Sequence, residues 1–209
     1  MKKLIRTAAI AASAIALVGG AAGTAHANAP WDVKVGGGYG SGAATFASTG
    51  ALSFTVPLLP MSCTSSNGSG AVTTGAAVNN PVAAITSIGF TGCTGPGGLP
   101  MGVTKGAGNW NLNLANDPNG PTVWTGTITG INARVTDQVG GTTCDFQVTG
   151  SVAASFSETT QVLSINNSTG LTVTLLNGTT CLGLVANGDP ATFDGDYLVT
   201  TAGGAVNIT

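Results

Sequence analysis

The 209-residue chain is poor in charge: its six Lys and Arg and eight Asp and Glu make up 7% of the residues, against about 25% in an ordinary soluble domain. Its formal net charge is −2, and its hydrophobic fraction of 43% is close to normal. Nucleic-acid binding requires clustered Lys and Arg, which this chain does not have, so we expect no nucleic-acid partner.

The first 27 residues have the composition of a secretory signal peptide. Lys2, Lys3 and Arg6 precede an apolar, alanine-rich run that is too short to span a bilayer. The sequence Ala25–Ala27 has the small-x-small form of a cleavage site. We therefore expect cleavage after Ala27 and a mature chain, residues 28–209, that is secreted or held at the cell surface.

Cleavage would also remove residues that carry chemistry. The chain's one histidine, His26, would leave, together with three of the six basic residues. The mature chain would keep Lys34, Lys105 and Arg134 against eight acidic residues, a net charge of −5. Without histidine, Ser-His-Asp catalysis, Cys-His catalysis and histidine-ligated zinc are all excluded. We therefore expect a non-enzymatic protein with no cofactor.

Alternation of apolar and polar residues with a period of two dominates the mature sequence. The longest run starts at Cys144 and predicts a half-buried strand with Phe146, Val148, Val152 and Phe156 on its inner face. Similar inner faces are predicted for three other groups of residues: Trp110, Leu112 and Leu114; Leu171, Val173 and Leu175; and Phe193, Tyr197 and Val199.

Residues 123–135 alternate as well, but the apolar phase changes partway along. Trp124 and Ile128 share one phase, whereas the apolar residues from Ile131 onward follow the other. A change of this kind at Gly130 predicts a β-bulge or a tight bend in the strand.

Clusters of Gly, Pro, Asn and Asp separate these runs and supply the backbone conformations that chain reversals need. They occur at 66–70, 94–98, 116–120, 139–141, 166–170 and 187–190. Short strands with closely spaced turns predict an all-β fold, an antiparallel sandwich or barrel, with little helix after the signal peptide. Residues 28–209 are enough for a single all-β domain, and a weak similarity between the two halves leaves an internal duplication open.

Four cysteines occur in the mature chain, and an even number in an exported protein predicts two disulfides. Of the three possible connectivities we favour Cys63–Cys93 and Cys144–Cys181. These pairs are 30 and 37 positions apart, and the second cysteine of each ends a strand-like run. A metal site would require paired Cys or Cys/His spacing, and a cysteine nucleophile would require a base that the mature chain does not supply through histidine.

The tightest acidic cluster is formed by Asp189, Asp194 and Asp196. Asp194 and Asp196 are two positions apart and could share one strand face, where carboxylates can bind a hard cation such as Ca²⁺ or act as a catalytic pair. We favour a turn at Asp189 and a solvated face at the other two, because exposed acids on a strand are ordinary. The three are retained as weak metal candidates, and no catalytic or cofactor residue is assigned.

Three segments, Ser62–Thr64, Phe90–Gly98 and Cys181–Asp189, resemble small secreted proteins of actinobacteria, most of them uncharacterised. The resemblance implies an exported, β-rich, disulfide-bonded protein. It carries over no functional residue, because the matching segments are turns and cysteine contexts.

These observations favour a non-catalytic secreted or cell-envelope protein with a structural or binding role. The main alternative is a carrier that holds an apolar ligand in a barrel or sandwich cavity. Two further alternatives are an outer-membrane pore, which an aromatic content of 5% disfavours, and an inhibitor of a secreted hydrolase. The partners to consider are cell-envelope components, an apolar ligand and a second copy of the chain.

Overall fold

The computed structural model describes residues 30–115, 122–138 and 143–209. The predicted signal peptide and the turns predicted at 116–120 and 139–141 lie outside these residues. Within them, the helical content is one short 3-10 turn, η1 (Pro96–Gly98). The strands are β1 (Trp31–Val35), β2 (Ala43–Ser48), β3 (Leu52–Val56), β4 (Leu59–Cys63), β5 (Ser65–Val72), β6 (Gly75–Val78), β7 (Ala83–Thr91), β8 (Cys93–Thr94), β9 (Pro100–Lys105), β10 (Trp110–Leu114), β11 (Val123–Asp137), β12 (Asp145–Ser157), β13 (Val162–Leu175), β14 (Pro190–Thr201) and β15 (Val206–Ile208). The all-β prediction is confirmed, whereas the turns predicted at 66–70 and 166–170 are wrong, because these residues lie inside β5 and β13.

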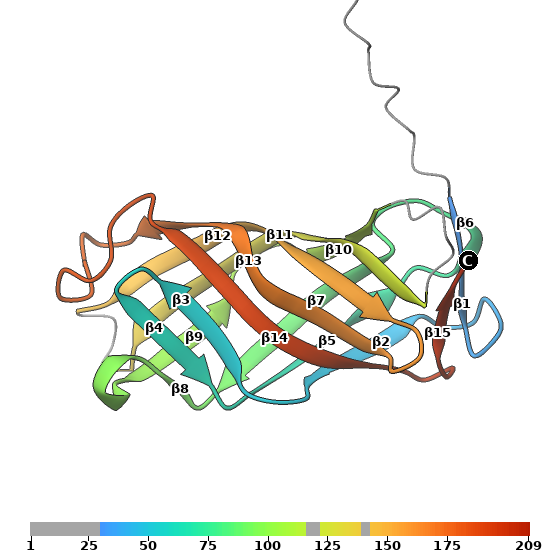
Figure 1. Ribbon diagram of the computed structural model, residues 1–209, viewed down its shortest axis with the longest axis horizontal. Helices are drawn as coiled ribbons and strands as arrows, with labels where there is room; N and C mark the ends of the chain where they lie inside the picture. The colour runs from blue at the N-terminus through green and yellow to red at the C-terminus, as the bar shows by residue number, and fades with distance from the viewer. Residues whose placement is uncertain (1–29, 116–121, 139–142) are drawn as a thin grey trace, which may run out of the picture.

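The strands form an elongated antiparallel barrel (Figure 1). The long strands β11, β12, β13 and β14 lie side by side along its length. At one end β14 pairs with β2, and the ring continues through β5, β7 and β10 back to β11. At the other end β14 pairs with β3, and the ring continues through β4, β8 and β9 back to β11. Of the two predicted architectures, sandwich and barrel, the chain adopts the barrel.

The barrel interior is filled by the apolar positions of the alternating strands. On β12 the four side chains predicted to face inward are each at most 5% exposed. Phe54 on β3 lies directly opposite Phe193 on β14, and their rings stack with centroids 4.4 Å apart. Phe90 from β7 meets Phe54 edge-on at 5.4 Å. These aromatic side chains bring β3, β7 and β14 together in one core.

Strand β11 contains the predicted bulge. Ile128 pairs with Val152 and Ile131 pairs with Gly150, so β11 has one more residue than β12 across this step. Gly130 takes the left-handed conformation there, with φ of +72°. Because of this extra residue, the side chain of Ile131 points into the barrel and is 5% exposed. The predicted change of phase is confirmed.

A small second sheet, in the order β15, β1, β6, covers the end of the barrel formed by β2, β5, β7 and β10 (Figure 1). We call this sheet the lid. It joins the two ends of the described chain, because the backbone N–H of Asp32 donates to the carbonyl of Thr209 and the N–H of Thr209 donates back to the carbonyl of Asp32.

Two polar side chains from the β12–β13 turn region tie the lid to the barrel. The Glu158 carboxylate accepts hydrogen bonds from the Trp124 indole at 2.8 Å and from the backbone N–H of Ile208 at 2.5 Å. The Gln161 amide exchanges two hydrogen bonds with the backbone of Val206, at 2.7 and 3.0 Å. The lid is therefore held in one register.

Both disulfides have the predicted pairing, Cys63–Cys93 and Cys144–Cys181. The first joins β4 to β8, and the second joins the start of β12 to the loop between β13 and β14. Both therefore lie toward the barrel end opposite the lid, where β3, β4, β8 and β9 complete the ring.

Replacing Gly130 with alanine is expected to destabilise the barrel. A Cβ at this position would lie 2.7 Å from the carbonyl oxygen of Asn109, and the backbone is left-handed. We expect the free energy of unfolding, measured by denaturant titration, to fall by about 1–3 kcal/mol. Gly50→Ala is the matched control, because a Cβ there meets nothing within 4 Å, and a similar loss in that variant would contradict the assigned cause.

Removing the Cys144–Cys181 disulfide by the double change to serine is expected to lower the free energy of unfolding by about 3–4 kcal/mol, the loop-closure value for a bridge of this span. The bridge links positions 37 apart, and that of Cys63–Cys93 links positions 30 apart. The same denaturant titration should therefore give similar losses for the two double variants. An unchanged midpoint in either variant would show that the corresponding bridge does not stabilise the fold.

Candidate functional site

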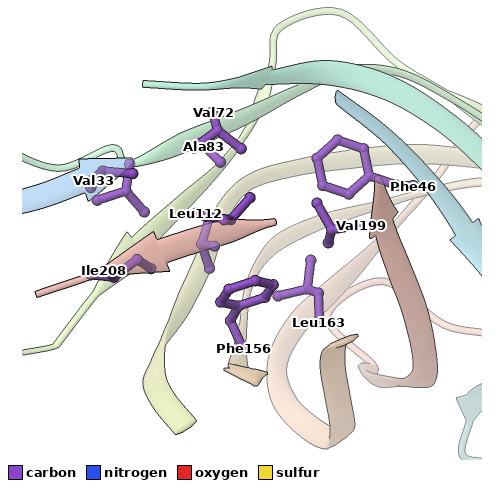
Figure 2. A pocket seen from close by; sticks show the side chains of 11 residues that line it. Val33, Phe46, Val72, Ala83, Leu112, Phe156, Leu163, Val199 and Ile208 are labelled. Atoms are coloured by element: carbon purple, nitrogen blue, oxygen red, sulfur yellow. The ribbon is translucent and has the colours of Figure 1, made fainter. Parts of the chain in front are cut away.

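The space between the lid and the barrel is a small apolar cavity of about 20 Å³. Figure 2 shows Val33 and Ile208 of the lid on one side of this space and Phe46, Phe156 and Val199 of the barrel on the other. A cavity of this volume could hold at most about one water molecule, and an apolar lining offers that water no partner. The space is far smaller than the several hundred Å³ that a ligand pocket needs.

The three weak metal candidates lie at ordinary positions. The Asp189 carboxylate accepts a hydrogen bond from the backbone N–H of Ala186 at 2.8 Å, which closes a turn. Asp194 and Asp196 are exposed on the outer face of β14, opposite in phase to Phe193 and Tyr197. Among the residues that the structure describes, no three His, Cys, Asp or Glu side chains are placed to hold a metal ion.

Asp145 is a buried carboxylate that the sequence reasoning did not single out. Its side chain is 1% exposed, and it accepts two hydrogen bonds from the Arg134 guanidinium, both at 2.7 Å, and one from Asn177 at 2.7 Å. These bonds, with those of Arg134 the strongest cause, lower the pKa of Asp145 below its usual value. A carboxylate with three donors is held ionised, so its role is to fix the strand start beside the disulfide.

Asp137 is the second buried carboxylate, and it has a similar structural role. It accepts hydrogen bonds from the backbone N–H groups of Thr143 at 2.9 Å and Cys144 at 3.1 Å, and also from the Thr143 hydroxyl. The sequence contained a signal for its burial, because Asp137 continues the inward phase of Ile131 and Val135 on β11. Both buried carboxylates therefore hold together the backbone around the Cys144–Cys181 bridge.

A groove of about 440 Å³ opens in the barrel wall where β7 and β9 diverge. β7 pairs with β10 over Ala83–Ile85, but it pairs with β9 only at Gly89, opposite Thr104. β7 also has a bulge before this point, because Ser69 pairs with Ser87 while the next residue, Gly70, pairs with Ile85. The sheet therefore separates locally, and the groove occupies the separation.

The groove combines hydroxyl groups, an aromatic ring and an ammonium group. Thr86, Ser87 and Thr104 supply the hydroxyls, and Phe90 and Lys105 also line it. Phe90 is partly exposed, and its ring is held inside by Phe54 and by Trp110, whose ring centroid is 6.4 Å away.

Lys105 differs from the other two basic residues of the described chain. Lys34 pairs with Asp32 at 2.7 Å, and Arg134 pairs with Asp145 at 2.7 Å. Within residues 30–115, 122–138 and 143–209, Lys105 makes no salt bridge, and its ammonium donates to the carbonyls of Gly106 and Gly108. An ammonium has three donors, so one remains for an anionic group.

A second surface lies at the disulfide end, around a cavity of about 150 Å³ lined by the Cys144–Cys181 bridge and several leucines. Leu182 beside it is 79% exposed, and Leu58 in the β3–β4 turn is 62% exposed. Cys181 and Leu182 both take left-handed backbone conformations, with φ of +51° and +60°. Among the described residues that line this surface, the polar side chain is that of Thr143, and its hydroxyl already donates to Asp137.

Sequence reasoning did not find the groove. One local signal was available, because the adjacent polar residues Thr86 and Ser87 interrupt the alternation of 83–91. The separation of the strands, however, depends on which strands pair with β7, and no local pattern gives that information.

Comparison with known proteins adds no further assignment. No family model matches the chain, no curated protein matches it, and no solved structure matches it. The described residues contain no helix that is long and apolar enough to span a membrane.

The pKa of Asp145 predicts a specific acid response. A carboxyl with a lowered pKa stabilises the fold above its unfolded value of about 3.8, and this contribution disappears as the pH falls through the folded pKa. Asp145→Asn should therefore be less stable than the parent near neutral pH, and the difference should narrow between about pH 5 and pH 2. Denaturant titration at several pH values measures this.

The exposed Asp196 supplies the control for that experiment. Asp196→Asn removes the same charge as Asp145→Asn but breaks no buried hydrogen bond. Its free energy of unfolding should therefore stay within about 0.5 kcal/mol of that of the parent. If the Asp145→Asn difference stayed constant over the whole pH range, the Arg134 pairing would not be its cause.

Proposed function

We propose that the protein is a non-catalytic secreted or cell-envelope protein with a binding role, and that the groove between β7 and β9 is its binding site. The observation that carries this proposal is that one open space is lined by hydroxyl-bearing side chains, by the partly exposed Phe90 and by Lys105, which makes no salt bridge within the described residues. Concave sites that mix an apolar wall with a few polar groups are the usual form of small-ligand sites.

The rest of the molecule supports binding over the alternatives from the sequence. A carrier of an apolar ligand needs interior space, and the cavity beneath the lid is about 20 Å³. A pore would present an apolar band to lipid, whereas the outer face of β14 carries Asp194, Asp196 and Thr200. The two disulfides are compatible with an oxidising, extracellular environment. An inhibitor of a secreted hydrolase has no specific feature in its favour.

A non-catalytic role is supported by the chemistry that the groove lacks. Lys105 is its one titratable side chain. The two buried carboxylates are not among the residues that line the groove, and they are engaged by Arg134 and by backbone N–H groups. General acid–base catalysis requires a proton donor or acceptor positioned at the reacting group, and the described lining of the groove offers no carboxyl or imidazole.

Purified mature protein should give no turnover in a screen of polysaccharide, ester and peptide substrates. Asp194→Asn should be indistinguishable from the parent in that screen, because Asp194 lies on the outer face of β14. Turnover by the parent that is abolished in Asp194→Asn would contradict the proposal. It would move the functional site to the acidic cluster.

A further inference from the structure

Gly89 in the groove is a glycine that the fold does not require. Glycine inside a strand weakens it and is usually kept for a steric or conformational reason. Every other glycine in the barrel strands would place a Cβ within 3.1 Å of a neighbouring atom. A Cβ at Gly89 would meet nothing nearer than the Asn67 carbonyl at 4.0 Å, and its backbone is not left-handed. What glycine provides at this position is open space at the point where β7 meets β9.

Lys105 indicates the charge of the occupant. Its ammonium has a donor to spare beside this open space, while the other basic side chains of the described residues are paired with carboxylates. A single carboxylate on the ligand would complete its hydrogen bonding. A ligand with many negative charges is disfavoured, because the mature chain itself carries a net charge of −5.

The remaining lining indicates the rest of the ligand. Of the three hydroxyl-bearing side chains, Thr86 and Thr104 donate to the carbonyls of Ser69 and Arg134. Their oxygens are left as acceptors, which suits a ligand with several hydroxyl groups of its own. Phe90, which packs on the core but is partly exposed and lines the groove, adds apolar surface against which the carbon atoms of a saturated ring can pack. A groove of about 440 Å³ has room for one or two such rings.

We infer that the groove between β7 and β9 binds a sugar acid, a hydroxylated ring that carries one carboxylate. The carboxylate pairs with Lys105, the ring lies over Gly89 against Phe90, and the ring hydroxyls contact Ser87 and Thr104. This assignment rests on the proposed binding role and specifies its ligand.

The test is a titration of the mature, disulfide-intact protein with glucuronate and, separately, with glucose at low salt, followed by amide NMR. We expect shift changes at the amides of Gly89, Lys105 and Gly106. Glucuronate should bind about fivefold more tightly than glucose, the factor expected for one exposed ion pair. Lys105→Gln should remove this preference. Lys34→Gln, which loses an ammonium already paired with Asp32, should retain it.

Gly89→Val is the second arm of the test, because its Cβ would meet nothing nearer than the Asn67 carbonyl at 4.0 Å and its side chain would occupy the groove. It should abolish binding of both sugars while the melting temperature stays equal or rises, since valine favours strands. Gly89→Ala, which adds a single carbon, should weaken binding and keeps the test valid if the valine variant does not fold. Unchanged binding by either folded variant would overturn the inference.

The two proposals fail in distinguishable ways. Absence of shift changes in the groove at about 50 mM glucuronate, above the millimolar range of weak binding, would overturn the sugar-acid assignment alone. Equal affinity for glucose and glucuronate in the parent would do the same. New ligand signals that grow with time would show turnover, and would contradict the non-catalytic role.

Discussion

The structure depends on the change of partner along β14. Its C-terminal half pairs with β2 and its N-terminal half pairs with β3, so the same four long strands are closed by different short strands at each end. Closure satisfies the backbone hydrogen-bonding groups that an open sheet would leave exposed. Because one face of every strand then points into the core, the polar side chains that a ligand can reach lie on the outer face and at places where strand pairing is incomplete.

The groove between β7 and β9 is such a place. The ring at the lid end uses β7 and β10, the ring at the other end uses β9 and β8, and the two meet at a single residue pair, Gly89 and Thr104. The opening is therefore a geometric consequence of closing the barrel with one set of short strands at the lid end and another set at the opposite end. Phe90 is partly exposed through this opening although its ring belongs to the aromatic core. At this opening, Phe90 of the core therefore lies next to the polar side chains that line the groove.

Much of this architecture could be predicted from the sequence, because it depends on local pattern. Alternation identified the inward side chains of β12, and the change of phase at Gly130 identified the bulge, since both are properties of a single strand. The disulfides followed from spacing. Pairing such as that of β9 with β11, about 30 positions apart, could not be predicted in this way, and the groove depends on such pairings.

The lid has a consequence for how the chain reaches its final state. β1 and β15 are the first and last strands of the described chain, and they pair directly through Asp32 and Thr209. The barrel end beneath them can be sealed only after the most distant parts of the sequence have met, which requires the largest loop closure in the molecule. Until then Phe46, Phe156 and Val199 would lack the cover of Val33 and Ile208. The period between synthesis and sealing is therefore when this protein is most exposed to aggregation.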